Sequence, residues 1–301
     1  MLIWRLQKRV LNFVHVPPPH CGVDIVDAIY KCLKECGLKN KVFTVSMDNA
    51  SYNHSCLRFL REIFSRNRRL LCKGKLFHVR CCAHILNLLV QDGLGEIGHI
   101  IENVRESVKY INQYEARKQT FSKIVQQLQL GTKKLVIIDF PTRWNSTFQM
   151  LLCALKFKDV FPRFQGRKPN YDYLSTPEEW KNVEKVCEVL EVFNVVTNII
   201  FDSDYPTSNF YLSEIYRVKE ILNLKAMDES DFIRRMVGKM KGKFDKYWGE
   251  CNLLMVVASV MDPRCKLRLA EMFFPKIYSE AETRNNIEQV RGDLYQLYMS
   301  M

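Results

Sequence analysis

Apolar positions along the chain follow two different periods, and the change between them predicts the outline of the fold. In the first half, short β-rich apolar runs alternate with stretches in which apolar residues recur every three or four positions, as on one face of an α-helix. The predicted strands are residues 2–6, 42–45, 77–79 and 135–139. The predicted helices of this half are residues 23–36, 55–64, 83–90, 103–130 (as one helix or a broken pair) and 144–157.

The second half shows helical periodicity alone, after a polar loop at residues 165–175. Thr176 and Pro177, followed by two glutamates, are typical of a helix N-terminus. The sequence therefore predicts an α/β segment over residues 1–165 and an all-α segment over residues 176–301, with the seam at the polar loop.

Composition and charge indicate a folded, basic protein with reduced thiols. A hydrophobic share of 47% over 301 residues is typical of a folded chain with a substantial core. Lys and Arg exceed Asp and Glu by 45 to 33, a net charge of +12 that favours polyanionic partners but also fits a solvated basic surface. The 11 cysteines follow no secretion signal, and no long uncharged apolar run occurs, so we expect reduced thiols in a nuclear or cytosolic protein without a membrane partner.

Two carboxylates at the ends of predicted strands are candidates for a metal site. Asp48 follows residues 42–45 and Asp139 ends residues 135–139, and ligands and metals bind at this edge of α/β sheets. From the residues alone, an Asx turn that caps the next helix is the favoured interpretation of Asp48, and Pro141 favours a plain turn at Asp139. A two-metal site for phosphoryl transfer needs at least two and usually three carboxylates, so this pair alone is a small set.

Two further groups of side chains have both a chemical and a structural interpretation. His78, Cys81, Cys82 and His84 could bind zinc, but their spacing also fits packed residues at the start of an apolar helix. A basic stretch could contact phosphates or form a solvated loop. Its members are Arg66, Arg68, Arg69, Lys73 and Lys75.

Several segments, taken together and in order, resemble the hAT transposases of plants. Residues 4–13 with the prolines at 17–19 resemble the early core, and residues 43–51 resemble the segment that carries Asp48. Residues 80–88 match the family's Cys-x-x-His segment through Cys81 and His84, and residues 139–147 match its Arg-Trp-x-Ser segment through Arg143 and Trp144. Residues 257–266 are similar to a region shared with zinc-finger BED proteins of the "sleeper" type.

The resemblance implies a ribonuclease-H-like core interrupted by an all-α insertion, which cuts DNA with an Asp, Asp, Glu triad and Mg²⁺ or Mn²⁺. Asp48 matches the family's second Asp, whereas the first Asp, the Glu, the dimerisation region and the BED finger have no counterpart in this sequence. We therefore expect a partial ribonuclease-H-like α/β core, truncated at both ends and followed by a mainly α-helical segment. Such a chain would bind DNA without cutting it and without a cofactor, its oligomeric state being open. Arg143 and Trp144 join the basic stretch as candidate DNA contacts, or they simply pack.

Three other functions remain open on the sequence. The chain could be a divalent-metal transposase subunit completed by another chain, in which case nicking of DNA would be lost in Asp48→Ala. It could be a protein-interaction module that uses its helical half, or a gene fragment without a selected role. Salt-sensitive, sequence-independent DNA binding distinguishes the favoured interpretation from these.

Overall fold

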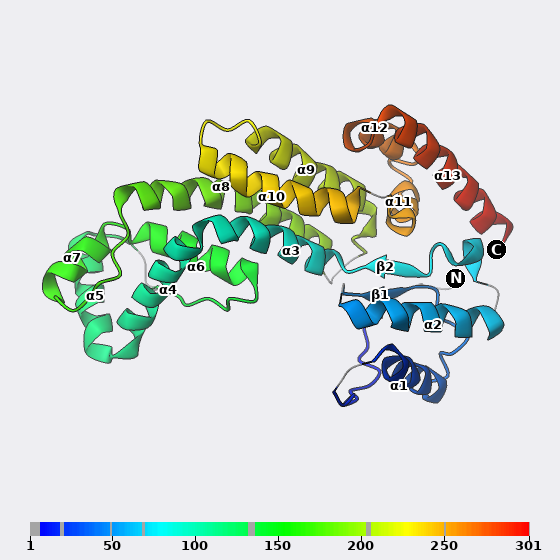
Figure 1. Cartoon of the computed structure of the whole chain (residues 1–301), viewed down its shortest axis with the longest axis horizontal. Coiled ribbons are helices and arrows are strands. Elements are labelled where there is room, and N and C mark those ends of the chain that lie inside the picture. The colour runs from blue at the N-terminus through cyan, green and yellow to red at the C-terminus, as the bar shows by residue number, and fades with distance from the viewer. Residues whose placement is uncertain are drawn as a thin grey trace. The chain divides into compact units, whose positions relative to one another are not determined.

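Helices dominate the computed structural model of the chain, and the residues it describes contain only two short strands (Figure 1). The described residues are 7–18, 21–48, 50–67, 70–131, 136–202, 206–249 and 251–300. They form two compact units, of which unit 1 combines residues 1–86, 197–217 and 245–301, and unit 2 combines residues 87–196 and 218–244. Neither unit is bounded by the polar loop at residues 165–175, where the sequence analysis divides the chain.

Unit 1 begins with two helices that pack against a small sheet. Its N-terminal elements are α1 (Gly22–Glu35), β1 (Val45–Met47), α2 (Ser51–Asn67), the 3-10 turn η1 (Leu71–Gly74), β2 (His78–Arg80) and the start of α3 (Cys82–Leu94). Its later elements are η3 (Ser208–Phe210), α11 (Leu253–Val260), α12 (Arg268–Ile277), α13 (Glu280–Met299), the start of α9 (Tyr211–Lys225) and the end of α10 (Asp231–Trp248).

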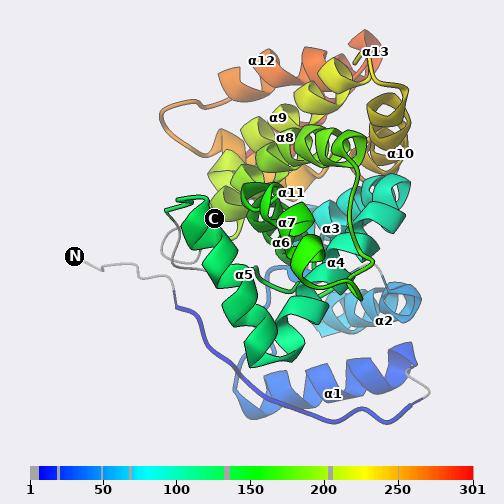
Figure 2. The ribbon, with the colours of Figure 1, turned by 90° about the vertical axis from the view of Figure 1, so that its left-hand side faces the viewer.

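The sheet of unit 1 is parallel, with Val45 opposite His78 and Met47 opposite Arg80. The helices α1 and α2 lie side by side (Figures 1 and 2). They share a core cluster of Val26, Cys56, Leu60, Phe64 and Phe77, against which the apolar residues of β1 also pack. This burial explains why α1, α2 and the strand at residues 77–79 were predictable from apolar spacing.

Unit 2 is helical in its described residues. It contains most of α3, the 3-10 turn η2 (Gly95–Ile97), α4 (Gly98–Gln113), α5 (Glu115–Gln127), α6 (Trp144–Lys156), α7 (Val160–Arg167), most of α8 (Pro177–Ile200), the end of α9 and most of α10. Aromatic side chains fill its core: Phe121 packs edge-on against Phe157 and Phe164, and Trp180 stacks on Phe161. Large buried rings of this kind contribute much of the apolar area that stabilises a helical unit.

Most helix predictions are confirmed, and the strand predictions less so. The predicted broken pair at residues 103–130 is α4 and α5, separated at Tyr114, whose backbone is extended. The N-terminus of α8 is a capping box, because the Thr176 N–H donates to Glu179 Oε2 (2.6 Å) and the Glu179 N–H donates to Thr176 Oγ1 (3.2 Å). None of the described helices is long and apolar enough to cross a membrane.

Two strand predictions are corrected and one cannot be compared. The run at residues 42–45 is displaced, since Val42 packs against the core cluster while backbone pairing starts at Val45. The described part of the run at residues 135–139 is not a strand, because residues 136–139 have no neighbouring strand there to pair with. The strand predicted at residues 2–6 lies outside the described residues. The sheet in the described residues has two strands, so the partial ribonuclease-H-like core stays a prediction.

Candidate nucleic-acid interface

A hollow of about 390 Å³ in unit 1 lies among α2, η1 and β2. Four cationic side chains and two histidines line it, and the described lining includes no carboxylate. We call it the basic hollow and define it by His54, Arg58, Arg61, Lys75, His78 and Arg80. A second hollow of about 330 Å³ shares Lys75, His78 and Arg80. Positive charge gathered in a concave site attracts polyanions.

The spacing of cations along α2 places them on one face of the helix. His54, Arg58 and Arg61 are separated by four and three residues, which brings them to the same side of an α-helix. The core-facing Cys56 and Leu60 follow a separate stripe and are fully buried. One amphipathic pattern therefore anchors α2 in unit 1 and turns its basic stripe toward the hollow.

Arg61 is held by an unusual turn. Its Nη2 atom donates a hydrogen bond to the carbonyl oxygen of Gly74. Gly74 has φ +78°, which favours glycine, and a Cβ at this position would lie 2.9 Å from Arg61 Nε, so a larger residue would displace the Arg61 side chain. The preceding Cys72 and Lys73 also have positive φ, 49° and 53°. Strain in non-glycine residues of this kind persists only where surrounding structure enforces it, as it does at many functional sites.

Strand alternation presents the remaining side chains of the hollow. Val79 is buried in the core, so His78 and Arg80 lie on the opposite face of β2. The guanidinium carbon of Arg80 is 5.9 Å from the centre of the Tyr247 ring, within the range of a cation–π contact. The face of β2 away from the core is therefore basic.

Among the described residues, Lys75 is the one cation of the basic hollow that has an acidic partner. Its Nζ atom is 3.3 Å from Oδ1 of Asp293, a residue of α13 that is only 1% exposed. The Sγ atom of Cys72 donates to the Asp293 carbonyl oxygen at 3.6 Å. These contacts tie the η1 turn to α13 and offset part of the charge of Lys75.

The pKa of His78 is affected both by its burial and by the positive charges around it. Burial lowers its pKa below the ordinary 6.5, and the charges of Arg80, His54 and Arg61 lower it further. Its Nε2 atom is buried and has no hydrogen-bond partner among the described residues. Such atoms are rare in folded proteins and call for a specific explanation.

Asp48, the residue that matches the transposase aspartate, forms an Asx turn just before α2. Its Oδ1 atom accepts hydrogen bonds from the Ala50 N–H (3.0 Å) and from Asn53 Nδ2 (2.6 Å). Across the described parts of the chain, no three His, Cys, Asp or Glu side chains lie together so that they could hold a metal ion. The donor set present in these residues therefore does not fit the Mg²⁺ or Mn²⁺ of Asp-Asp-Glu chemistry.

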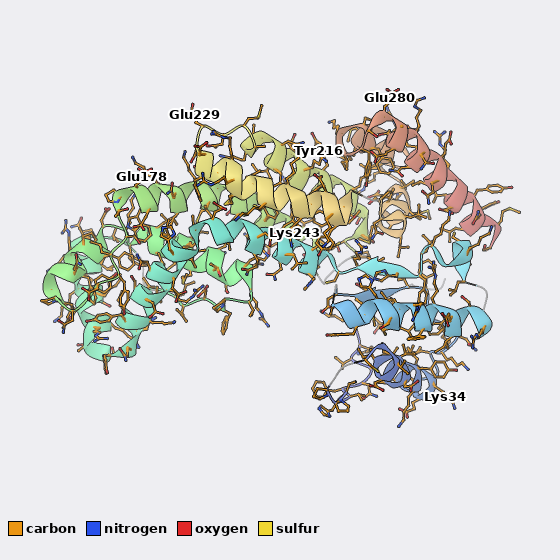
Figure 3. All side chains as sticks on the ribbon, in the orientation of Figure 1. Lys34, Glu178, Tyr216, Glu229, Lys243 and Glu280 are labelled. Carbon is orange, nitrogen blue, oxygen red and sulfur yellow. The ribbon has the colours of Figure 1, made fainter. Side chains whose placement is uncertain are left out.

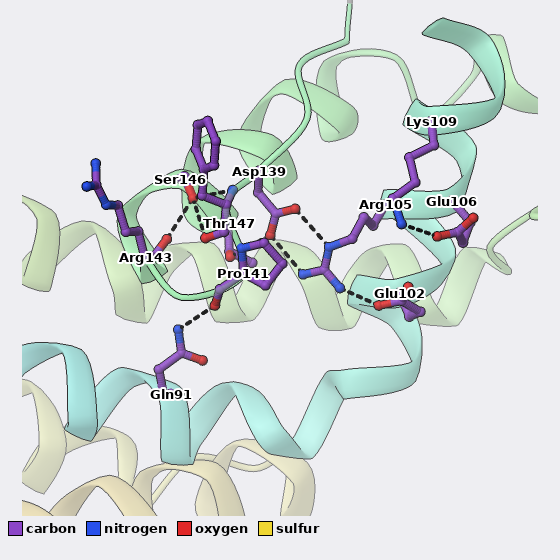
Figure 4. Close-up of polar contacts among 11 residues, drawn as sticks. Gln91, Glu102, Arg105, Glu106, Lys109, Asp139, Pro141, Arg143, Ser146 and Thr147 are labelled. Carbon is purple, nitrogen blue, oxygen red and sulfur yellow. Dashed lines mark hydrogen bonds and ion pairs between the residues drawn. The ribbon is translucent and has the colours of Figure 1, made fainter. Parts of the chain in front are cut away.

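Asp139 is structural. Arg105 donates to it from Nε and Nη2, each at 2.8 Å, and Thr147 Oγ1 lies 2.7 Å from its Oδ2 (Figure 4). Burial on its own would raise the pKa of Asp139, but the hydrogen bonds from Arg105 and Thr147 outweigh it and hold the pKa below its ordinary range. Both carboxylate oxygens are engaged, which leaves the plain-turn interpretation and not the metal-site one.

The Arg-Trp pair of the same loop is divided between surface and core. Trp144 is 4% exposed and packs against Phe148 and Phe193, with ring centres 6.3 and 6.4 Å away. Its side chain therefore packs and presents no surface to DNA. Arg143 is exposed on unit 2, so it remains a candidate contact that is separate from the basic hollow of unit 1.

The Cys-His motif does not assemble a zinc site among the described residues. Burial raises the pKa of Cys82 to about 12, which disfavours the thiolate that zinc requires. The Cys81 N–H donates to the Met47 carbonyl and so closes the end of the sheet. Cys81 and His84 are both partly exposed.

The predicted basic stretch contributes only in part to the basic hollow. Lys75 lines it, whereas Arg66 and Lys73 are exposed and lie outside its lining. Arg68 and Arg69 lie outside the described residues. The sequence analysis missed His54, Arg58, Arg61 and Arg80, although the helical spacing of the first three was a signal that could have found them.

Three family profiles match successive parts of the chain. They are described as the ZBED1 RNase-like domain (residues 3–76), the ZBED1 RNase-like helical domain (residues 79–189) and the hAT-like transposase, RNase-H fold (residues 209–300). The chain belongs to the hAT-like transposase family. Its profiles meet near residues 76–79 and 189–209.

Plant proteins derived from this family are similar over almost the whole chain. The zinc finger BED domain-containing protein RICESLEEPER 2 of Oryza sativa subsp. japonica is 35% identical over 296 residues, which are 98% of this chain and 41% of the relative. The zinc finger BED domain-containing protein DAYSLEEPER of Arabidopsis thaliana is 29% identical over 295 residues, 98% of this chain and 42% of the relative. This hAT-like chain thus spans about two fifths of the length of these relatives.

Proposed function

We propose that this hAT-like chain is a DNA-binding segment of a transposase-derived protein that acts in the nucleus. One observation carries the proposal: the basic hollow, which unites the α2 stripe with β2 and has no carboxylate in its described lining. The net charge of +12 acts in the same direction, because a basic protein is drawn to DNA before any close contact forms.

The chemistry of the hollow favours the DNA backbone over the bases. Arginine guanidinium groups match phosphate oxygens with paired N–H donors, and they keep their charge at every physiological pH. Contacts to phosphate position a protein on DNA without reading the sequence. The expected binding is therefore salt-sensitive and nearly independent of sequence.

Fluorescence anisotropy with labelled 20-base-pair duplexes over a salt series tests the proposal. The logarithm of the association constant should fall linearly with the logarithm of salt concentration, by about 0.9 for each phosphate contacted. Charge reversal on the exposed face of α2, by Arg58→Glu together with Arg66→Glu, should weaken binding at least tenfold at low salt.

A matched control changes charge equally elsewhere in unit 1. Lys31→Glu together with Lys34→Glu alters exposed side chains of α1 (Lys34 is labelled in Figure 3) and should weaken binding far less. Equal losses in both double variants would show non-specific attraction by net charge, and no binding at low salt would refute the proposal.

The proposal assigns no cleavage step to Asp48. Because Oδ1 of Asp48 accepts hydrogen bonds in a turn before α2, as an asparagine oxygen also can, Asp48→Asn should leave DNA affinity unchanged within twofold. Supercoiled plasmid incubated with Mg²⁺ or Mn²⁺ should remain intact, and metal-dependent nicking that disappears in Asp48→Asn would overturn this part.

A further inference from the structure

Two arginines of the basic hollow are fixed before any ligand arrives. Arg61 is anchored by the Gly74 carbonyl, and Arg80 is placed over the Tyr247 ring. Each guanidinium has five N–H donors, so one anchoring contact leaves several for a ligand. Because the side chains are already ordered, binding loses less conformational entropy than it would with mobile surface cations.

The hollow also contains a histidine whose protonated form a bound anion would stabilise. His78 lines both hollows, and its buried Nε2 atom has no hydrogen-bond partner among the described residues. Arg80, His54 and Arg61 repel a proton on its ring. A negative charge among the arginines would reverse this repulsion and favour the imidazolium, whose two N–H groups both donate.

The charge of the site favours an anion, and its size leaves room for more than a free ion. The volume of about 390 Å³ is far larger than one phosphate requires, so a phosphate group can enter with the chain to which it is attached. The described lining has no carboxylate to repel it, and Asp293 beside Lys75 is directed to that lysine. Asn53, whose side chain donates to Asp48, precedes His54, so the hollow begins in the first turn of α2.

We propose that the basic hollow is a single-phosphate site in which Arg61 and Arg80 together bind one phosphate group, with His78 beside it. The choice of DNA as the source of this phosphate rests on the proposed function. One held phosphate would fix where the DNA backbone passes α2, in contrast to a diffuse basic surface.

The salt dependence of DNA binding distinguishes one shared phosphate from two separate ones. Counterion release counts the phosphates that are contacted, so Arg61→Ala together with Arg80→Ala should reduce the salt slope by about one. Affinity at 0.1 M salt should fall roughly tenfold. A reduction by about two would mean that each arginine binds its own phosphate, and an unchanged slope would place the contacts elsewhere; either result overturns the proposal.

Inorganic phosphate provides a second test, which needs no variant. The imidazole C–H signals of His54 and His78, followed by NMR, should shift saturably with phosphate and not with chloride at equal ionic strength. His99 of α4, whose side chain is 70% exposed, is the internal control and should not shift saturably. Equal responses to both salts, or a parallel shift of His99, would overturn the single-phosphate site.

The two tests separate this inference from the proposed function. Salt-sensitive DNA binding without a phosphate-specific shift leaves the proposed function intact and refutes the single-phosphate site. A saturable phosphate shift in a chain that binds no DNA keeps the anion site and refutes both DNA as its source and the proposed function.

Discussion

Replacing Asp139 tests whether the segment before Arg143 and Trp144 is held in place by charge. Asp139→Ala removes the acceptor of two Arg105 hydrogen bonds and the partner of Thr147 Oγ1 (Figure 4). Asp139 is 5% exposed, and the side chain of Arg105 is 13% exposed, so the variant leaves a cation that water reaches poorly. The loop that carries Arg143 and Trp144 depends on this ion pair.

The size of the effect follows from what Arg105 retains. Removing one partner of a buried ion pair lowers the free energy of unfolding by about 3–5 kcal/mol. Arg105 keeps its contact with Glu102, an exposed partner that contributes at most about 1 kcal/mol. We therefore expect a loss near the lower limit, about 3 kcal/mol. With a urea m-value of about 2 kcal/mol/M, the midpoint should fall by about 1.5 M.

Urea unfolding followed by hydrogen exchange would measure both the loss and its location. The free energy of unfolding should fall, and exchange should accelerate in residues 136–151 before it does so in unit 1. Asp172→Ala, at an exposed aspartate of unit 2, is the matched control and should change stability by less than about 0.5 kcal/mol. A loss below about 1 kcal/mol for Asp139→Ala would refute the ion-pair argument.

The same ion pair makes the stability of the chain depend on pH. Because the folded pKa of Asp139 lies below its ordinary 3.8, its stabilising contribution is complete above the unfolded pKa and is lost as pH falls through the folded pKa. The difference in stability between the parent chain and Asp139→Ala should therefore shrink below about pH 4. A difference that stays constant down to pH 2 would contradict the assigned charge state.

Three other perturbations follow from local geometry. Gly74→Ala introduces a Cβ against Arg61 at a left-handed position. It should lower the free energy of unfolding by about 1–2 kcal/mol and weaken DNA binding. Unchanged urea and anisotropy curves would contradict the Gly74 contact. Thr176→Ala removes the cap of α8 and should lower the free energy of unfolding by about 1 kcal/mol, or about 2–4 °C in Tm. An unchanged Tm would contradict the capping box with Glu179. DNA affinity should rise as pH falls from neutral into the acid range, since a bound phosphate favours the protonated form of His78, and His78→Phe should flatten that profile.

Helices could be predicted from the sequence because their signals are local. The spacing of Ile25, Ile29 and Leu33 and the Thr176-Pro177 start are contained within one element each, and both predictions are confirmed. Strands depend on partners far along the chain, so the apolar run before Asp139 could not be distinguished from a buried loop. The β1 displacement has the same origin, since His78, 33 residues after Val45, decides where pairing begins.

The candidate site was predicted less well, for a related reason. The basic hollow joins a stripe on α2 to alternate positions of β2, and only tertiary structure brings the two together. Net charge indicated a polyanion but gave no location. The cations of residues 66–75 are neighbours along the sequence and are easily recognised as a cluster. Arg58 and Arg61, by contrast, belong to an ordinary amphipathic helix pattern. Trp144 matched a family motif, but its burial depends on Phe193, 49 residues later.

The discontinuous make-up of unit 1 has a consequence for how the chain is made. Its first stretch ends at residue 86 and its last begins at residue 245, so roughly 160 residues of translation separate them. At about 5–20 residues per second, the ribosome takes on the order of 10–30 s to synthesise the interval. During that time Asp293, which pairs with Lys75 beside the basic hollow, does not yet exist. The nascent N-terminal stretch therefore lacks its last partner throughout the synthesis of unit 2, whose own last stretch ends at residue 244, and chaperone demand should be greatest in this interval.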